Sequence, residues 1–278
     1  MKKVKKISIL FPFLFALIFI FTPSKGSAQI NNPSMEQIDQ YLLEQGFPQD
    51  YISILADEQK QGFYRDEAKF VVLDTVDGLL SENDTIQPFA MNNWSGTVST
   101  VQVKSGIKGV LKYRLTYNWN WNQRATFNLT DKFGIAWSDD WDALENSSMS
   151  SYTPRGINSA GSYSSVTYNY TGYGDYKPGN GIGWAFDLKH DFTGTDGKYY
   201  ETSSHSGYGS IDIVKAHNGS GRTDSSSSVG QYFHKQGALT GSLGFNGSGK
   251  PSISISASIN YDESPQAGKQ WYWTHQDY

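Results

Sequence analysis

Residues 111–121 read Leu-Lys-Tyr-Arg-Leu-Thr-Tyr-Asn-Trp-Asn-Trp, with an apolar or aromatic side chain at every odd position and a polar one at every even position. This period of two is typical of a β-strand that buries one face. Residues 253–261 repeat the pattern, and shorter examples occur at 133–137, 182–188 and 208–213. Clusters of Gly, Ser, Asn and Asp separate them, as at 172–183 and 218–228. The pattern predicts a mainly β protein, an antiparallel, jelly-roll-like β-sandwich.

A short α-helical unit is expected ahead of the sandwich. Ser34 and Gln37 have the spacing of a capping box, in which each side chain satisfies a backbone donor of the other residue. Gly46 is a helix stop, Pro48 opens a second helix, and Asp57 caps a third.

The charge distribution also predicts two parts. Residues 29–93 contain twelve acidic and three basic residues, whereas residues 94–278 have no net charge and contain all eight tryptophans. We therefore expect an acidic helical appendage at 29–80, a linker at 81–93 and the β-sandwich domain at 94–278. The appendage is either a removable pro-region or a flap that packs on a sheet edge.

The first 28 residues have the features of a secretory signal peptide. Four lysines in residues 1–6 precede an apolar run at 7–21, and a run of small residues ends at Ala28. The apolar run is shorter than the roughly 20 residues that a membrane-spanning helix needs. We expect a secreted, extracellular protein with no stable membrane span after cleavage.

Composition and motifs argue against several kinds of chemistry. The chain has no cysteine, which excludes disulfides, thiolate zinc sites and iron–sulfur clusters. Its acidic balance excludes nucleic-acid binding through a basic face. Residues 244–250 have the glycine spacing of a phosphate-binding loop, but Pro251 stands where Ser or Thr is needed, so a hairpin turn explains them. The five scattered histidines lack the spacing of a helical metal pair, and we expect no cofactor or metal.

Two alternatives remain open beside simple binding. A glycan-cleaving enzyme needs two carboxylates across the sugar bond, and the sandwich contains the glutamates Glu145, Glu201 and Glu263, of which no pair stands out. A β-type pore-forming protein is compatible with the Ser/Ile alternation at 252–259, which an ordinary sandwich strand shows equally.

Aromatic residues in or beside loops are the candidate binding residues. Sugar rings stack on Trp and Tyr, and the candidates are Trp137, Trp141, Tyr170, Tyr173 and Tyr176. The aromatic residues of 111–121 share one strand face and are assigned to the core. The sequence therefore predicts a secreted, non-catalytic protein that binds a glycan, cell-wall polymer or other cell-surface component through loop aromatics.

The signal peptide makes a direct prediction. The exported protein should begin at Gln29, because the small residues before it form the cleavage site. Intact-mass measurement of the protein recovered from culture medium checks this, and a chain that still begins at Met1 would contradict it.

Overall fold

The computed structural model describes residues 33–77, 91 and 93–278, and the predicted signal peptide lies outside them. Its helices are α1 (Met35–Glu44), α2 (Gln49–Ile54) and α3 (Asp57–Arg65). The capping box is confirmed, because the Ser34 hydroxyl accepts from the Gln37 N–H and the Gln37 side chain accepts from the Ser34 N–H. Gly46 follows α1 with a φ of 87°, in the left-handed region that glycine tolerates. Asp57 was expected to cap α3, but Ala56 occupies that position and Asp57 is the first helical residue.

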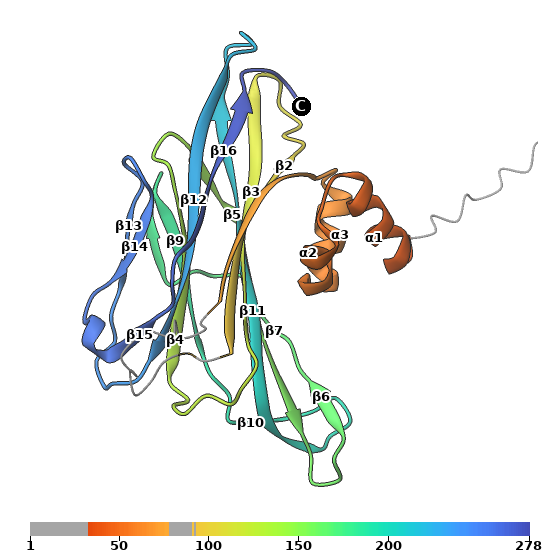
Figure 1. Ribbon diagram of the computed structural model, residues 1–278, viewed down its shortest axis with the longest axis vertical. Helices are drawn as coiled ribbons and strands as arrows, with labels where there is room; N and C mark the ends of the chain where they lie inside the picture. The colour runs from red at the N-terminus through yellow and green to blue at the C-terminus, as the bar shows by residue number, and fades with distance from the viewer. Residues whose placement is uncertain (1–32, 78–90, 92) are drawn as a thin grey trace, which may run out of the picture. The chain divides into compact units, whose positions relative to one another are not determined.

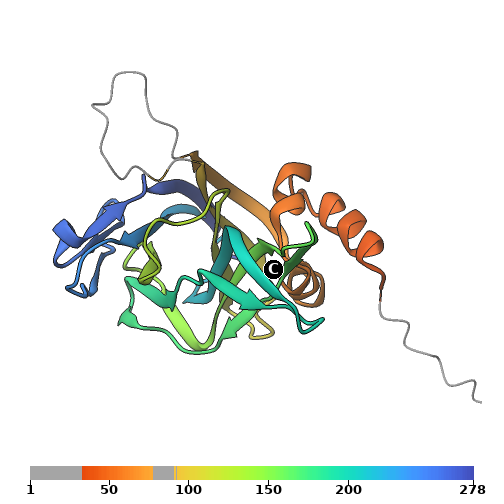
Figure 2. The same ribbon diagram turned by 90° about the horizontal axis from the view of Figure 1, so that it is seen from below.

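The predicted antiparallel β-sandwich is confirmed (Figures 1 and 2). Sheet A has the strand order β1-β2-β3-β11-β5-β6, with β10 paired to β11 and β7 to β5. Its strands are β1 (Lys69–Asp77), β2 (Trp94–Val103), β3 (Val110–Trp121), β5 (Asp142–Ile157), β6 (Tyr163–Ser165), β7 (Tyr168–Tyr170), β10 (Asp191–Thr193) and β11 (Tyr199–Ala216). Sheet B has the order β15-β12-β4-β9-β8, with β16 paired to β12. Its strands are β4 (Thr130–Trp137), β8 (Asp175–Lys177), β9 (Gly181–Asp187), β12 (Thr223–Lys235), β15 (Tyr261–Glu263) and β16 (Ala267–Thr274).

The main core lies between the two sheets and is strongly aromatic. The odd residues of β3 point into it, as the alternation predicts. Trp119 stacks on Phe186 of β9 at a ring-centroid distance of 5.1 Å and contacts Tyr232 of β12 at 4.8 Å. Gly230 of β12 faces the ring of Tyr117 in the same core, and a Cβ at this position would lie only 2.2 Å from that ring.

The helices cover the opposite face of sheet A beside β1, β2 and β3 (Figures 1 and 2). Their apolar side chains form a second core with the outward residues of β2, and this core includes Ile38, Leu42, Phe63, Val101 and Val103. The expected flap on a sheet edge is therefore a layer on a sheet face. The polar even positions of β3, expected to face solvent, are buried beneath it at Arg114, Thr116 and Asn118.

Polar side chains of β3 bind the helical layer directly. The Arg114 guanidinium donates to both carboxylate oxygens of Asp212 on β11, at 2.6 and 3.0 Å, and forms an ion pair with Asp66 just after α3 at 2.8 Å. Asn118 Nδ2 donates to Gln59 Oε1 of α3 at 2.9 Å. These contacts satisfy polar groups that burial would otherwise leave unpaired.

Two of the expected segments can be compared with the described residues. Residues 69–77, placed in the helical appendage, form β1 and pair antiparallel with β2. The expected linker at 81–93 lies outside the described residues except for Met91 and Asn93. Among the described helices, none combines the length and the apolar character that crossing a membrane requires.

The glycine-rich segment at 244–250 lies in a hairpin, as predicted. Strands β13 (Leu243–Asn246) and β14 (Ser252–Ile255) pair with each other. Leu243 and Phe245 pack on sheet B where Gly181 and Gly183 leave space. At the C-terminal end, the Tyr278 hydroxyl donates to the Glu67 carbonyl at 2.6 Å, and Lys69 Nζ lies 4.4 Å from the centre of the Tyr278 ring.

A buried histidine in the main core makes stability depend on pH. The Tyr152 hydroxyl accepts from the Lys189 backbone N–H at 2.9 Å and is 2.9 Å from Nδ1 of His205, so it donates its own proton to that nitrogen. His205 is therefore neutral with its proton on Nε2, which has no hydrogen-bond partner among the described residues. Burial, with a smaller contribution from the nearby His234, lowers the pKa of His205 to about 4.

We expect stability to fall on acidification because of His205. His205 takes up a proton near pH 6.5 in the unfolded chain and only near pH 4 in the folded chain. The free energy of unfolding therefore falls by about 3 kcal/mol as the pH falls through this window. His205→Gln keeps an acceptor for Tyr152 but does not titrate, and should flatten this part of the profile. Urea unfolding at pH 7, 5.5 and 4 measures it, with His190→Gln, whose side chain is 49% exposed, as control. Equal pH dependence in His205→Gln and the unmodified chain would show that His205 is not the cause of the loss of stability in acid.

Candidate functional site

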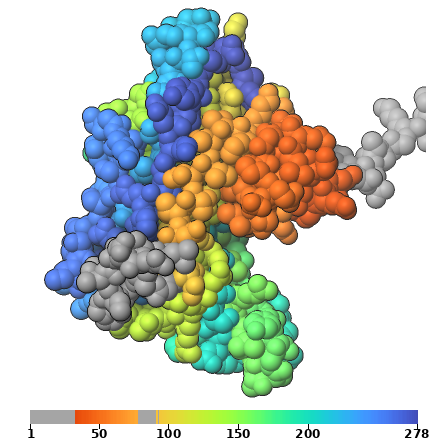
Figure 3. All heavy atoms as spheres, in the orientation of Figure 1, coloured from red at the N-terminus to blue at the C-terminus, as the bar shows by residue number. Residues whose placement is uncertain are grey.

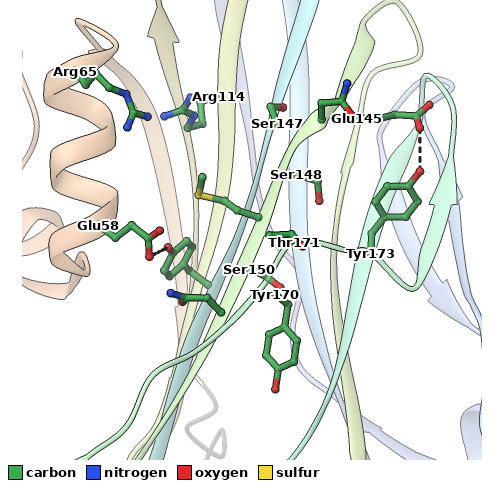
Figure 4. A pocket seen from close by; sticks show the side chains of 14 residues that line it. Glu58, Arg65, Arg114, Glu145, Ser147, Ser148, Ser150, Tyr170, Thr171 and Tyr173 are labelled. Atoms are coloured by element: carbon green, nitrogen blue, oxygen red, sulfur yellow. Dashed lines mark hydrogen bonds between the residues drawn. The ribbon is translucent and has the colours of Figure 1, made fainter.

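Two hollows lie on the outer face of sheet A beside α3. The first, called the tyrosine hollow, has a volume of about 630 Å³ (Figure 4). It is lined by Glu58, Arg65, Arg114, the β5 residues 145–150, Asn169, Tyr170, Thr171, Tyr173 and Tyr208. The second, called the amide hollow, has a volume of about 500 Å³. In the space-filling view an indentation separates the helices, in orange, from the green strands below them, where the amide hollow lies (Figure 3).

The floor of the amide hollow is built by strand register. Residues directly opposite one another on paired strands point to the same face of the sheet. Pairing of β2, β3, β11 and β5 aligns two such rows across the sheet: Thr97, Asn118, Tyr208 and Ser151, and next to it Ser95, Asn120, Ser206 and Thr153. All eight residues line the hollow. The Thr153 hydroxyl also lies 2.9 Å from that of Thr167, which extends the second row.

The first row is buried, and its Asn118 and Tyr208 are hydrogen-bonded to α3. The second row is half-buried and suits a ligand that both donates and accepts hydrogen bonds. A hydroxyl or a carboxamide can do either, and an asparagine offers both kinds of group at once. Arg155 is the one charged residue that lines the amide hollow within the described chain. Its floor is therefore polar but almost uncharged.

The tyrosine hollow has a different electrostatic character. Its walls present Glu58 from α3 and Glu145 from β5, with the β5 serines between them (Figure 4). Neither glutamate forms an ion pair within the described residues, whereas Arg114 is paired with Asp212 and Asp66. Arg65, which also lines this hollow, is paired with Asp66 as well, so the two glutamates are the charged lining residues outside ion pairs within the described chain.

Each glutamate is held by a tyrosine. Tyr208 donates to Glu58 Oε2 at 3.2 Å, and Tyr173 donates to Glu145 Oε2 at 2.9 Å. Burial, followed by the Glu58 charge, raises the pKa of Tyr208. The hydrogen bond to Glu145 raises the pKa of Tyr173. Both phenols therefore remain protonated donors at neutral pH.

The expected aromatic residues separate into two groups. Tyr170 and Tyr173 line the tyrosine hollow, and Tyr176 of β8 packs against Tyr173 with their ring centroids 5.2 Å apart. Trp137 and Trp141, expected to be available beside loops, are instead 0% and 1% exposed in the main core.

The burial of the two tryptophans has a clear physical cause. Trp137 ends β4 in phase with the inward-facing Phe133 and Ile135, so the alternation itself indicated its burial. Trp141 immediately precedes β5, and its indole N–H donates to Ser226 Oγ at 2.8 Å. A position beside a loop did not leave either ring in contact with solvent.

Several residues that line the two hollows were not identified as site residues from the sequence. Glu58 and Gln59 lie in the helical unit, and their approach to β3 and β11 is a long-range contact that no local pattern encodes. Asn118 and Asn120 belong to the alternating segment 111–121 and were assigned only to its polar face, and Ser206 lies outside the segments identified by alternation. Glu145, expected in a loop, lies in β5.

Comparisons with known proteins leave the function open. Neither a family model nor a curated protein matches the sequence. Among solved structures, the membrane-inserted form of the Clostridium perfringens NetB toxin aligns with a TM-score of 0.32 and 9% identity, over 74% of this chain and 96% of that one. Clostridium perfringens delta-toxin aligns with a TM-score of 0.26 and 7% identity, over 73% of this chain and 87% of that one. The enzymatically active domain of bacteriophage CBA120 tailspike protein 4 aligns with a TM-score of 0.22 and 8% identity, over 53% and 18% of the two chains. These are distant β proteins, and similarity at this level supports no functional argument.

The burial of Trp137 and Trp141 predicts a large effect on stability. Trp137→Ala and Trp141→Ala should each cost about 3–5 kcal/mol of unfolding free energy, because each leaves a cavity among aromatic rings. Urea unfolding measures the loss, with Tyr272→Ala, at a residue 66% exposed, as the control that changes little. A loss below about 0.5 kcal/mol in the tryptophan variants would show that these rings are not core residues.

Proposed function

We propose that the protein is secreted and binds a glycan in the groove formed by the tyrosine hollow and the amide hollow, called the sheet A groove. The supporting observation is the half-buried cross-strand row of hydroxyl and amide side chains, Ser95, Asn120, Ser206 and Thr153, in the same groove as a tyrosine wall. A sugar presents hydroxyl groups, which such rows bind as donors and as acceptors. It also presents an apolar ring face, which suits the rings of Tyr170 and Tyr173.

The shape of the site also favours binding over a purely structural role. Hollows of 500–630 Å³ fall in the range of ligand sites in proteins. Most of their lining residues come from strands and from a helix fixed to the sheet by buried polar contacts, and Thr171 and Tyr173 come from the loop between β7 and β8. A preformed polar surface of this kind binds with less loss of conformational entropy than a flexible loop does.

Glycan hydrolysis is a second candidate with one observation in its favour. Glu58 and Glu145 are two carboxylates that line the same hollow, as a glycan hydrolase needs. The release of reducing ends from a bound polysaccharide tests this directly. Loss of that release in both Glu58→Gln and Glu145→Gln would support it, and no release would exclude it.

Glycan binding predicts retention of the mature chain on insoluble polysaccharide. We would incubate residues 29–278 with cellulose, chitin, xylan, mannan and peptidoglycan and measure depletion from the supernatant. Tyr173→Ala should weaken binding about tenfold, or about 1.4 kcal/mol, because the variant loses a ring on the groove wall.

The matched control is Tyr163→Ala, which removes an exposed tyrosine of β6 outside both hollows and should bind normally. Retention on none of the polysaccharides would refute the proposed function. Equal weakening by both tyrosine variants would place the binding site elsewhere.

A further inference from the structure

The two hollows follow one another along a single strand. Residues 145–150 of β5 line the tyrosine hollow, and Ser151, Thr153 and Arg155 of the same strand line the amide hollow. Residues 145–148 form a bulge, because Leu144 pairs with Asp212 and Met149 with Ser210. The extended part from Met149 to Arg155 is about 20 Å long at the rise of a β-strand. The sheet A groove is therefore long compared with a single small ligand.

Tyr208 joins the hollows. It lines both of them, and its pairing with Asn118 on β3 and Ser151 on β5 places it in the first polar row. It is 3% exposed, and its hydroxyl donates to Glu58, so its ring is held within the floor. A ligand that passes over Tyr208 contacts both hollows.

Walls on two sides restrict what can lie in the tyrosine hollow. Glu58 and Arg65 of α3 stand on one side of the β5 serines, and Tyr173 stands on the other (Figure 4). These walls suit a narrow chain aligned with β5. Side branches would meet α3 or the tyrosines.

The charges also restrict the ligand. Arg65 and Arg114 also line the tyrosine hollow, but both are paired with Asp66. Glu58 and Glu145 form no ion pair within the described residues, so carboxylate or phosphate groups on a ligand would be repelled beside them. The amide hollow is lined mainly by neutral donors and acceptors. The selection against acidic groups therefore comes from the tyrosine hollow, because the one charged residue that lines the amide hollow within the described chain is the cation Arg155.

Building on the proposed function, we infer that the ligand is an unbranched, non-acidic polysaccharide that lies along β5 and occupies both hollows at once. Short oligosaccharides then fill one hollow. Once a chain is long enough to cross Tyr208, binding to the second hollow becomes intramolecular, and affinity rises steeply with length.

The test is a length series with the mature chain. The probes are oligosaccharides of about two to eight units prepared from the neutral polysaccharide retained in the pull-down, with affinity measured by calorimetry. We expect affinity to rise roughly a hundredfold between the shortest chains and those that span both hollows, and then to level off.

Two variants locate the hollows. Tyr173→Ala changes the tyrosine hollow and Asn120→Ala the amide hollow. Each should weaken the longest oligosaccharide about tenfold, and the double variant about a hundredfold, because distant sites contribute independently. The shortest oligosaccharide should respond to one variant only. Thermal unfolding confirms that each variant is folded, and Tyr163→Ala again serves as the control.

The outcomes separate this inference from the function on which it rests. Equal affinity for short and long oligosaccharides would overturn the inference and leave glycan binding intact. Binding of a polygalacturonate octamer as tight as that of the neutral octamer would overturn the assignment of a non-acidic ligand. Retention of no polysaccharide would remove the proposed function itself.

Discussion

The structure depends on a buried ion pair between its helical layer and its sheet. Arg114 donates to Asp212 on the neighbouring strand and reaches Asp66 at the end of α3. Removing Arg114 should destabilise the fold, because the buried Asp212 would keep only the more distant Lys112, at 3.7 Å, as a counter-charge within the described residues. The pair therefore fixes the end of α3 to sheet A. Glu58 and Gln59 of the same helix consequently lie beside the outer face of sheet A, where they line the sheet A groove.

The main core has a different physical basis. Its stability comes from aromatic rings packed between the sheets, and glycines such as Gly230 admit rings that any larger residue would exclude. The indole N–H groups of Trp94, Trp119 and Trp271 have no hydrogen-bond partner within the described residues. The close packing of the rings therefore leaves some buried donors unpaired, at a cost in stability. His205 adds a further buried polar group to the same region.

Local sequence rules predicted local features well. Alternation at 111–121 identified β3, the Ser34–Gln37 spacing identified the start of α1, and the glycines near 244–250 identified a hairpin. Alternation shows that two faces of a strand differ, but it does not show what covers each face. The polar face of β3 was therefore not expected to lie under helices, where Asn118 meets Gln59.

The groove was harder to predict, because its residues come from segments that are distant in the chain. Tyr170 and Tyr173, chosen because they lie in or beside loops, line the tyrosine hollow, whereas Trp137 and Trp141, chosen by the same argument, are buried in the main core. The side of a loop on which a ring lies depends on the strands around it. The strand register that aligns Asn120 with Ser206 becomes visible only when the sheet order is known.

The contacts of the C-terminal residues with the start of sheet A have a consequence for folding. Tyr278 binds Glu67 and lies against Lys69, and Gly268 of β16 donates to Asp74 of β1 at 2.8 Å. The segment that links the helices to the sheet thus receives its last partners from residues made some two hundred positions later. Such long-range closure slows folding, because the entropy of closing a large loop is lost before the contacts form. During synthesis, these contacts can therefore form only after the C-terminal residues have been made.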